Sequence, residues 1–185
     1  MPEHDETRLL ADECAAEARY FVETAVEVAS GAAPESAIPL LLLATSQVQL
    51  MGARLGAIAD VVLAERFEAD APDSDVDPLR TGIARLFDGL DEYADLEDPV
   101  TSGAVTSGSL SNDLAIITEA LTHGLAHHAA GRTTEALWWW QFSYLSAWGE
   151  RAAMAVRVLQ GLLAHVRLDA DEETVADAEF DALHG

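Results

Sequence analysis

Hydrophobic residues recur three and four positions apart along most of this chain, and we find no run with the two-residue alternation of a half-buried strand. The clearest stripe is formed by Leu79, Ile83, Leu86, Leu90 and Tyr93. The pattern predicts helices at about residues 6–30, 36–66, 78–96, 111–130, 134–148 and 150–168. We therefore predict an all-α fold, a single bundle of about six helices.

Glycine, proline and acidic residues mark the breaks between these helices. Gly31 is expected to end the first helix and Gly149 the fifth, while Ser111 and Thr133 are expected to cap the fourth and fifth. Residues 68–77 form an acidic linker, and residues 98–112, rich in Gly, Ser and Thr, predict a mobile loop. We predict one domain over residues 1–168, followed by an acidic tail at 169–185 that forms a weak helix or is disordered.

All four tryptophans lie in the predicted fifth helix, at Trp138, Trp139, Trp140 and Trp148. That helix is apolar almost all round, so we expect it to be buried on several sides and to occupy the centre of the bundle. The aromatic cluster is either core or the lining of a pocket or partner-binding surface. Gln141 lies within its apolar stripe, and a buried amide needs hydrogen-bond partners. His128 and Tyr144 are candidates for that role.

The same region contains one copy of a tetratricopeptide-like pattern, with small residues at Gly124, Gly131 and Ala136 and an aromatic at Trp140. A solenoid needs about three such repeats. The pattern therefore predicts one tight helical hairpin.

Candidate metal ligands occur on the fourth helix, where Glu119, His123 and His127 are four residues apart. This face points away from the apolar stripe, and no neighbour supplies further ligands, so we expect no metal and no cofactor. Two other patterns are missing: Gly103 and Gly108 are not followed by the lysine of a phosphate-binding loop, and there is no Gly-x-Ser-x-Gly elbow. Cys14 lies on an apolar stripe as an inert thiol. No catalytic residues are predicted.

The 33 acidic and 10 basic residues give a net charge of −23. Such a chain repels nucleic acid and anionic membranes, so we expect neither as a direct partner. The acidity serves solvation, or it attracts a basic partner or imitates nucleic acid. One cysteine and an acidic N-terminus favour the cytoplasm. Residues 38–51 are apolar but too short to span a bilayer, and they predict a buried core helix.

Several motifs together resemble a known bacterial family. They are Leu121, His123-Gly124 and His127, residues 131–137 (GRTTEAL), 138–144 (WWWQFSY), Trp148-Gly149, 164–168 (AHVRL), 37–42 (AIPLLL) and 52–56 (GARLG). Over most of residues 10–168 the chain is similar to the domain of unknown function 5063 family, which is frequent in actinobacteria. The resemblance implies a cytoplasmic protein of this size. It carries no established activity or catalytic residues.

Three functional hypotheses follow. The first is a non-enzymatic interaction or adaptor protein that binds an unknown protein partner through an aromatic-lined groove or an acidic face, with a homodimer as a further expectation. The second is a small-ligand or metal-binding bundle with its site near the histidines. The third is an acidic nucleic-acid mimic that binds a DNA-processing protein. The candidate binding residues are His123, His127, His128, Gln141, Tyr144, Trp138, Trp139 and Trp148.

Overall fold

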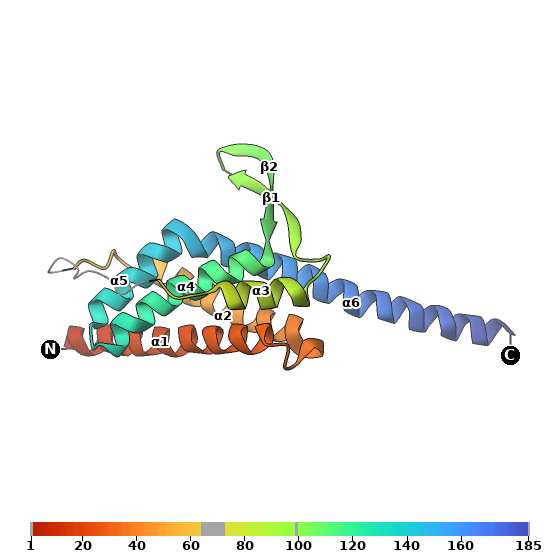
Figure 1. Cartoon of the computed structure of the whole chain (residues 1–185), viewed down its shortest axis with the longest axis horizontal. Coiled ribbons are helices and arrows are strands. Elements are labelled where there is room, and N and C mark those ends of the chain that lie inside the picture. The colour runs from red at the N-terminus through yellow and green to blue at the C-terminus, as the bar shows by residue number, and fades with distance from the viewer. Residues whose placement is uncertain (1, 64–72, 99, 185) are drawn as a thin grey trace.

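The structure, a computed structural model, describes the backbone of residues 2–63, 73–98 and 100–184, and the side chains of residues 5–63, 73–98 and 100–168. The elements run in the order α1 (Pro2–Ala29), the 3-10 turn η1 (Pro34–Ser36), α2 (Ala37–Ala57), α3 (Asp77–Leu86), β1 (Glu92–Asp98), β2 (Ser102–Ser109), α4 (Leu110–Ala129), α5 (Thr133–Ser143), the π-helical η2 (Tyr144–Trp148) and α6 (Gly149–His184). The fold is mostly helical, as predicted, and a hairpin of two strands projects from the helical body (Figure 1).

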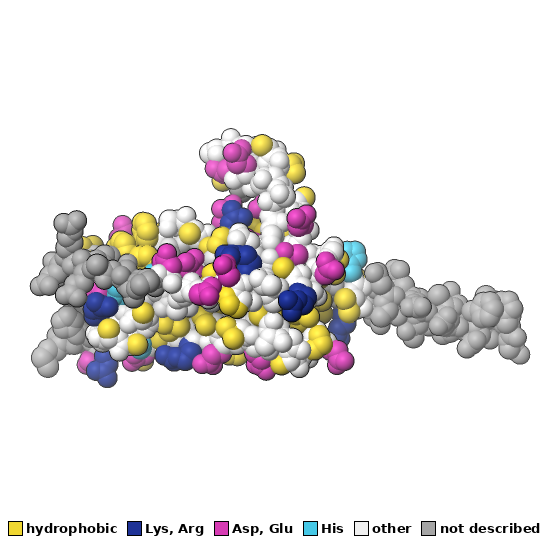
Figure 2. Space-filling model, viewed as in Figure 1, with side chains coloured by type: hydrophobic (Ala, Val, Ile, Leu, Met, Phe, Trp, Pro, Cys, Tyr) yellow, Lys and Arg dark blue, Asp and Glu magenta, His cyan; other side chains and the backbone are white. Residues whose placement is uncertain are grey.

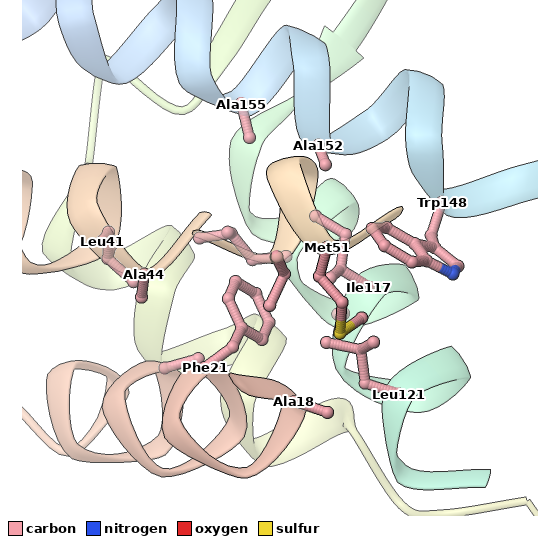
Figure 3. Close-up of a cluster of buried hydrophobic side chains, with 14 of the residues drawn as sticks. Ala18, Phe21, Leu41, Ala44, Met51, Ile117, Leu121, Trp148, Ala152 and Ala155 are labelled. Carbon is pink, nitrogen blue, oxygen red and sulfur yellow. The ribbon is translucent and has the colours of Figure 1, made fainter. Parts of the chain in front are cut away.

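The helices share one hydrophobic core. Side chains of α1, α2, α4, η2 and α6 converge there, among them Phe21, Met51, Ile117 and Trp148, all at most 1 % exposed (Figure 3). The helix with the most neighbours is α4, which packs against α1, α3, α5 and α6. The prediction that the Trp-rich helix is the central element is therefore wrong, because the outer face of α5 carries Phe142, which is 51 % exposed.

Helix α2 is shorter than predicted and ends at Ala57, while residues 64–66 of the predicted helix lie outside the described part of the chain. The turn after it is fixed by Gln141. Its side-chain Nε2 donates to the carbonyl oxygens of Leu55 (2.8 Å) and Ala59 (3.3 Å), and its Oε1 accepts from the Val61 amide (2.7 Å). These bonds satisfy carbonyls that have no partner within the helix. Backbone groups, rather than His128 and Tyr144, are thus the partners of the buried amide.

The segment Pro34–Ala57 is long and apolar enough, by length and composition, to cross a membrane. Here it packs against α1, α5 and α6, and its residues Leu41, Val48 and Leu55 are fully buried in the core. The predicted core helix at 38–51 is therefore buried on one face only, because Leu43 and Leu50 are 58 % and 63 % exposed.

The β-hairpin occupies positions for which the end of a helix and a mobile loop were predicted. Helix α3 ends at Leu86, and the chain turns through Gly89 (φ 79°) into β1, which pairs antiparallel with β2. A helix to residue 96 and a mobile loop at 98–112 are therefore both wrong. The three-and-four spacing continues beyond Leu86 by coincidence. Leu79 and Ile83 are buried, whereas Leu90 is 54 % exposed.

The predicted caps also differ from those in the structure. Ser109, not Ser111, is the N-cap of α4, and its hydroxyl accepts from the Asn112 amide (3.4 Å). Thr133 is already within α5. Gly149 does not end the Trp-rich helix, because α5 continues through the π turn η2 into α6. A Cβ at Gly149 would lie 2.5 Å from the Tyr144 carbonyl oxygen, so the π turn itself requires glycine.

Candidate functional site

The three candidate histidines do not form a common site. His123 Nε2 lies 3.1 Å from Asp73 Oδ1, His127 Nδ1 lies 2.9 Å from Glu135 Oε2, and His128 Nε2 lies 2.8 Å from Asp12 Oδ1. Each ring thus joins α4 to a different segment. Within the described ranges no group of three or more His, Cys, Asp or Glu side chains could hold a metal ion, and this includes the Glu119, His123 and His127 set.

The histidine face of α4 is covered by protein rather than by solvent. The ring of His123 lies 5.0 Å from that of Trp139, and His127 is 4 % exposed. This covering comes from the α4–α5 hairpin, in which the helices approach closely at Gly124. A Cβ at Gly124 would lie 2.0 Å from Trp140 Nε1. The predicted contact between a small residue and an aromatic one is therefore present.

The remaining aromatic candidates have structural roles. Trp140 and Trp148 are fully buried, and Trp148 Nε1 donates to Ser143 Oγ (3.0 Å). The ring of Tyr144 packs against Gly52, where a Cβ would be 2.2 Å from it. Trp138 is half-buried and stacks on Phe142 with ring centroids 4.9 Å apart. These residues form core and a short outer stack, and none of them lines the hollows described below.

A buried polar cluster lies at the foot of the hairpin, and the sequence did not predict it. The hydroxyl of Tyr93 on β1 donates to Oδ2 of Asp113 on α4. Asp113 is only 1 % exposed. Arg151 Nη1 on α6 lies 3.4 Å from Asp95 Oδ2 and 3.6 Å from Asp113 Oδ1. Burial raises the pKa of Asp113 to about 6, against the opposing effects of Tyr93 and Arg151. Burial, followed by Asp113, also raises the pKa of Tyr93. The cluster joins hairpin, α4 and α6.

Asp91 joins the other side of the hairpin to the start of α4 through hydrogen bonds. Its Oδ1 accepts from the Ser111 amide (2.7 Å), and its Oδ2 accepts from the hydroxyls of Ser109 (2.8 Å) and Ser111 (2.7 Å). A carboxylate at a helix N-terminus is also favoured by the helix dipole. Within β2, a Cβ at Gly108 would lie 2.3 Å from the Tyr93 ring, so glycine leaves room for that ring. Together, these contacts hold the hairpin upright on the body.

The upright hairpin forms a slot with α6, which we call the hairpin slot. It has a volume of about 500 Å³ and is lined by Ala94, Asp95, Leu96 and Val105 of the hairpin and by Glu150, Ala153, Met154 and Arg157 of α6. Leu96 and Val105 are opposite each other across the two strands, and they are 40 % and 73 % exposed. The slot is therefore an apolar surface that this chain leaves open to solvent.

Two smaller hollows lie beside β1. The first, which we call the α6 groove, has about 340 Å³ and lies beside β1 over the stretch of α6 from Met154 to His165. The second, which we call the acidic hollow, has about 320 Å³ and is lined by Ala84, Asp88, Gly89, Asp91 and Glu92. Figure 2 shows acidic side chains on the projecting hairpin and around its foot.

No sequence motif marks this region, because its residues are far apart in the chain. Tyr93 and Asp113 are separated by 20 positions, and Asp95 and Arg151 by 56. Their side chains meet only because the hairpin is placed between α4 and α6. The one local signal was the Gly- and Ser-rich stretch before α4, which is typical of a turn or an exposed strand as much as of a mobile loop.

The described chain is thus a mostly helical protein with a single projecting hairpin. Residues 5–165 match the family described as "Domain of unknown function (DUF5063)", and the chain belongs to this family. Among curated proteins, none matches the chain. The fold is similar to the crystal structure of protein BF1032 from Bacteroides fragilis, with 16 % sequence identity and a TM-score of 0.67 over 81 % of this chain and 89 % of that one. At this identity the likeness concerns the fold alone.

Proposed function

We propose that the protein is a non-enzymatic interaction module that binds a segment of a partner polypeptide in the hairpin slot. The observation that carries this proposal is the exposed pair Leu96 and Val105, which faces Met154 of α6 across the slot. Covering such apolar surface is favourable by roughly 25 cal/mol per Å². Isolated exposed apolar side chains are common, but a contiguous set on a projecting arm is typical of a binding surface.

The shape of the slot favours a macromolecular partner over an enclosed small ligand. The hairpin projects from the helical body (Figure 1). Val100, between its two strands, is 89 % exposed. A partner chain can therefore contact the hairpin and α6 at the same time. The net charge of −23 would accelerate the encounter with a basic partner and oppose binding to nucleic acid or anionic membranes. We place this function in the cytoplasm.

The proposed interaction surface is the hairpin slot and does not include the tryptophans. Trp140 and Trp148 are core residues, so they support the slot without contacting a partner. We further infer that α4 and α5 form one tetratricopeptide-like hairpin, in which Gly124 and Trp140 fix the distance between the helices. In this view the α4–α5 hairpin is scaffold, and β1, β2 and α6 provide recognition.

Site-specific photo-crosslinking tests the proposal. A photoreactive phenylalanine analogue replaces Val105 in the slot or, as control, Leu43 on α2, which is also well exposed (58 %). In extract of the source cells we expect a discrete crosslinked product from position 105, reduced when Leu96→Asp is added, and no such product from position 43. Equal products at both positions, or no product at position 105, would contradict the proposal.

A further inference from the structure

The three hollows around the hairpin are neighbours that share lining residues. The hairpin slot and the α6 groove share Ala94, Met154 and Arg157 as lining residues. The α6 groove and the acidic hollow share Gly89 and Glu92. The hollows therefore lie in series, from the slot, along α6, to the acidic hollow near the end of α3. We call this series the hairpin track.

The chemistry of the hairpin track changes from one end to the other. At the slot end the lining is mainly aliphatic, with Leu96, Val105 and Met154. At the opposite end the acidic hollow presents Asp88, Asp91 and Glu92, and no Lys or Arg is among its lining residues. Asp91 is already hydrogen-bonded to Ser109 and Ser111, whereas Asp88 and Glu92 are exposed. The slot end of the track thus favours aliphatic side chains of a bound partner, and the acidic end favours basic ones.

Resting on the function proposed above, we propose that the track binds an extended basic segment of the partner, with an aliphatic side chain in the slot and a Lys or Arg in the acidic hollow. The carboxylates of the hollow complement a cationic side chain, and the net charge of −23 acts in the same direction. An extended segment suits three neighbouring hollows that lie in series. Its main chain would cross Arg157.

Arg157 is suited to holding the main chain of such a segment. It lines both the slot and the α6 groove, and it forms no ion pair with any residue whose side chain the structure describes. Its guanidinium can donate to successive backbone carbonyls without requiring an acidic side chain. By contrast, Arg151 nearby is engaged by Asp95 and Asp113 and remains structural.

Selection of short random peptides displayed on phage, with the full-length chain as target, tests this inference. We expect enriched peptides to combine an aliphatic residue with a Lys or Arg a few positions away. Leu96→Asp should abolish their binding. The double variant Asp88→Asn/Glu92→Gln should weaken it about two- to fivefold at low salt, the effect of losing exposed charge pairs.

The matched control is Glu23→Gln/Glu27→Gln, which changes the net charge equally on the exposed face of α1. It should leave binding within experimental error. The inference would be overturned if the peptides whose binding is lost with Leu96→Asp contained no basic residues. It would also be overturned if both double variants weakened binding equally. Either result would leave the proposed function standing. If no selected peptide responds to Leu96→Asp, the proposed function fails as well.

Discussion

Gly124→Ala tests the close approach of α4 and α5 on which the scaffold depends. The added Cβ would lie 2.0 Å from Trp140 Nε1 and 2.3 Å from Cε2 of the same ring, which is fully buried. Overpacking of this kind costs about 1–3 kcal/mol. Moving the indole also strains its hydrogen bond to the Leu121 carbonyl (3.2 Å), worth about 1 kcal/mol. Alanine regains about 1 kcal/mol of helix propensity, so we expect a net loss of about 1–3 kcal/mol.

The same substitution at Gly161 on α6 is the matched control. No atom lies within 4 Å of a Cβ built there, so Gly161→Ala should stabilise the protein by about 0.5–1 kcal/mol through helix propensity alone. Urea unfolding followed by far-ultraviolet circular dichroism and tryptophan fluorescence measures both variants. If Gly124→Ala were as stable as Gly161→Ala, the close packing of Trp140 on α4 would be refuted.

Three further substitutions or treatments test other parts of the structure. The pKa of Asp113 is raised from 3.8 to about 6 in the folded chain, so the folded chain holds this proton more tightly than the unfolded chain and stability is lost as pH rises through this range. Asp113→Asn should therefore gain roughly 3 kcal/mol relative to wild type when the pH is raised from well below 3.8 to well above 6. An unchanged difference in unfolding free energy across a pH series would oppose this. Gln141→Leu removes the three hydrogen bonds that hold the turn after α2 and should cost about 3 kcal/mol, with faster amide exchange at Val61; wild-type protection at that amide would count against the assigned role. Burial raises the pKa of the Cys14 thiol to about 12, so a thiol reagent at mildly alkaline pH should label it only after unfolding, and rapid labelling of the native protein would contradict its burial.

Helical periodicity allowed much of the helical body to be predicted. Buried positions recur every three or four residues in α1 and α2, as at Phe21 and Ala25 or at Leu41, Ala44 and Val48. The contact between Gly124 and Trp140 also followed from local pattern. The π turn did not, because its boundary depends on how Tyr144 and Gly149 pack rather than on composition.

The hairpin could not be predicted from the hydrophobic pattern because so few of its side chains are buried. All but one of the side chains of β1 are at least partly exposed, and β2 has no buried residue, so neither strand needs alternating hydrophobic positions. It is held instead by polar contacts such as Tyr93 with Asp113. The role of the predicted site residues on α4 and α5 could not be read from the sequence for a different reason. A histidine or tryptophan motif looks the same whether it binds a ligand or, like His127 with Glu135, joins two helices.

Methyl NMR of methionine tests the slot most directly, because the two described methionines lie in contrasting places. Met154 lines the slot, whereas Met51 is 1 % exposed in the core. When the partner segment recovered by crosslinking is titrated into the labelled full-length protein, we expect the Met154 methyl signal to shift until binding is saturated and the Met51 signal to stay in place. Binding of the segment with no change at Met154 would contradict the claim that the hairpin slot is the binding surface.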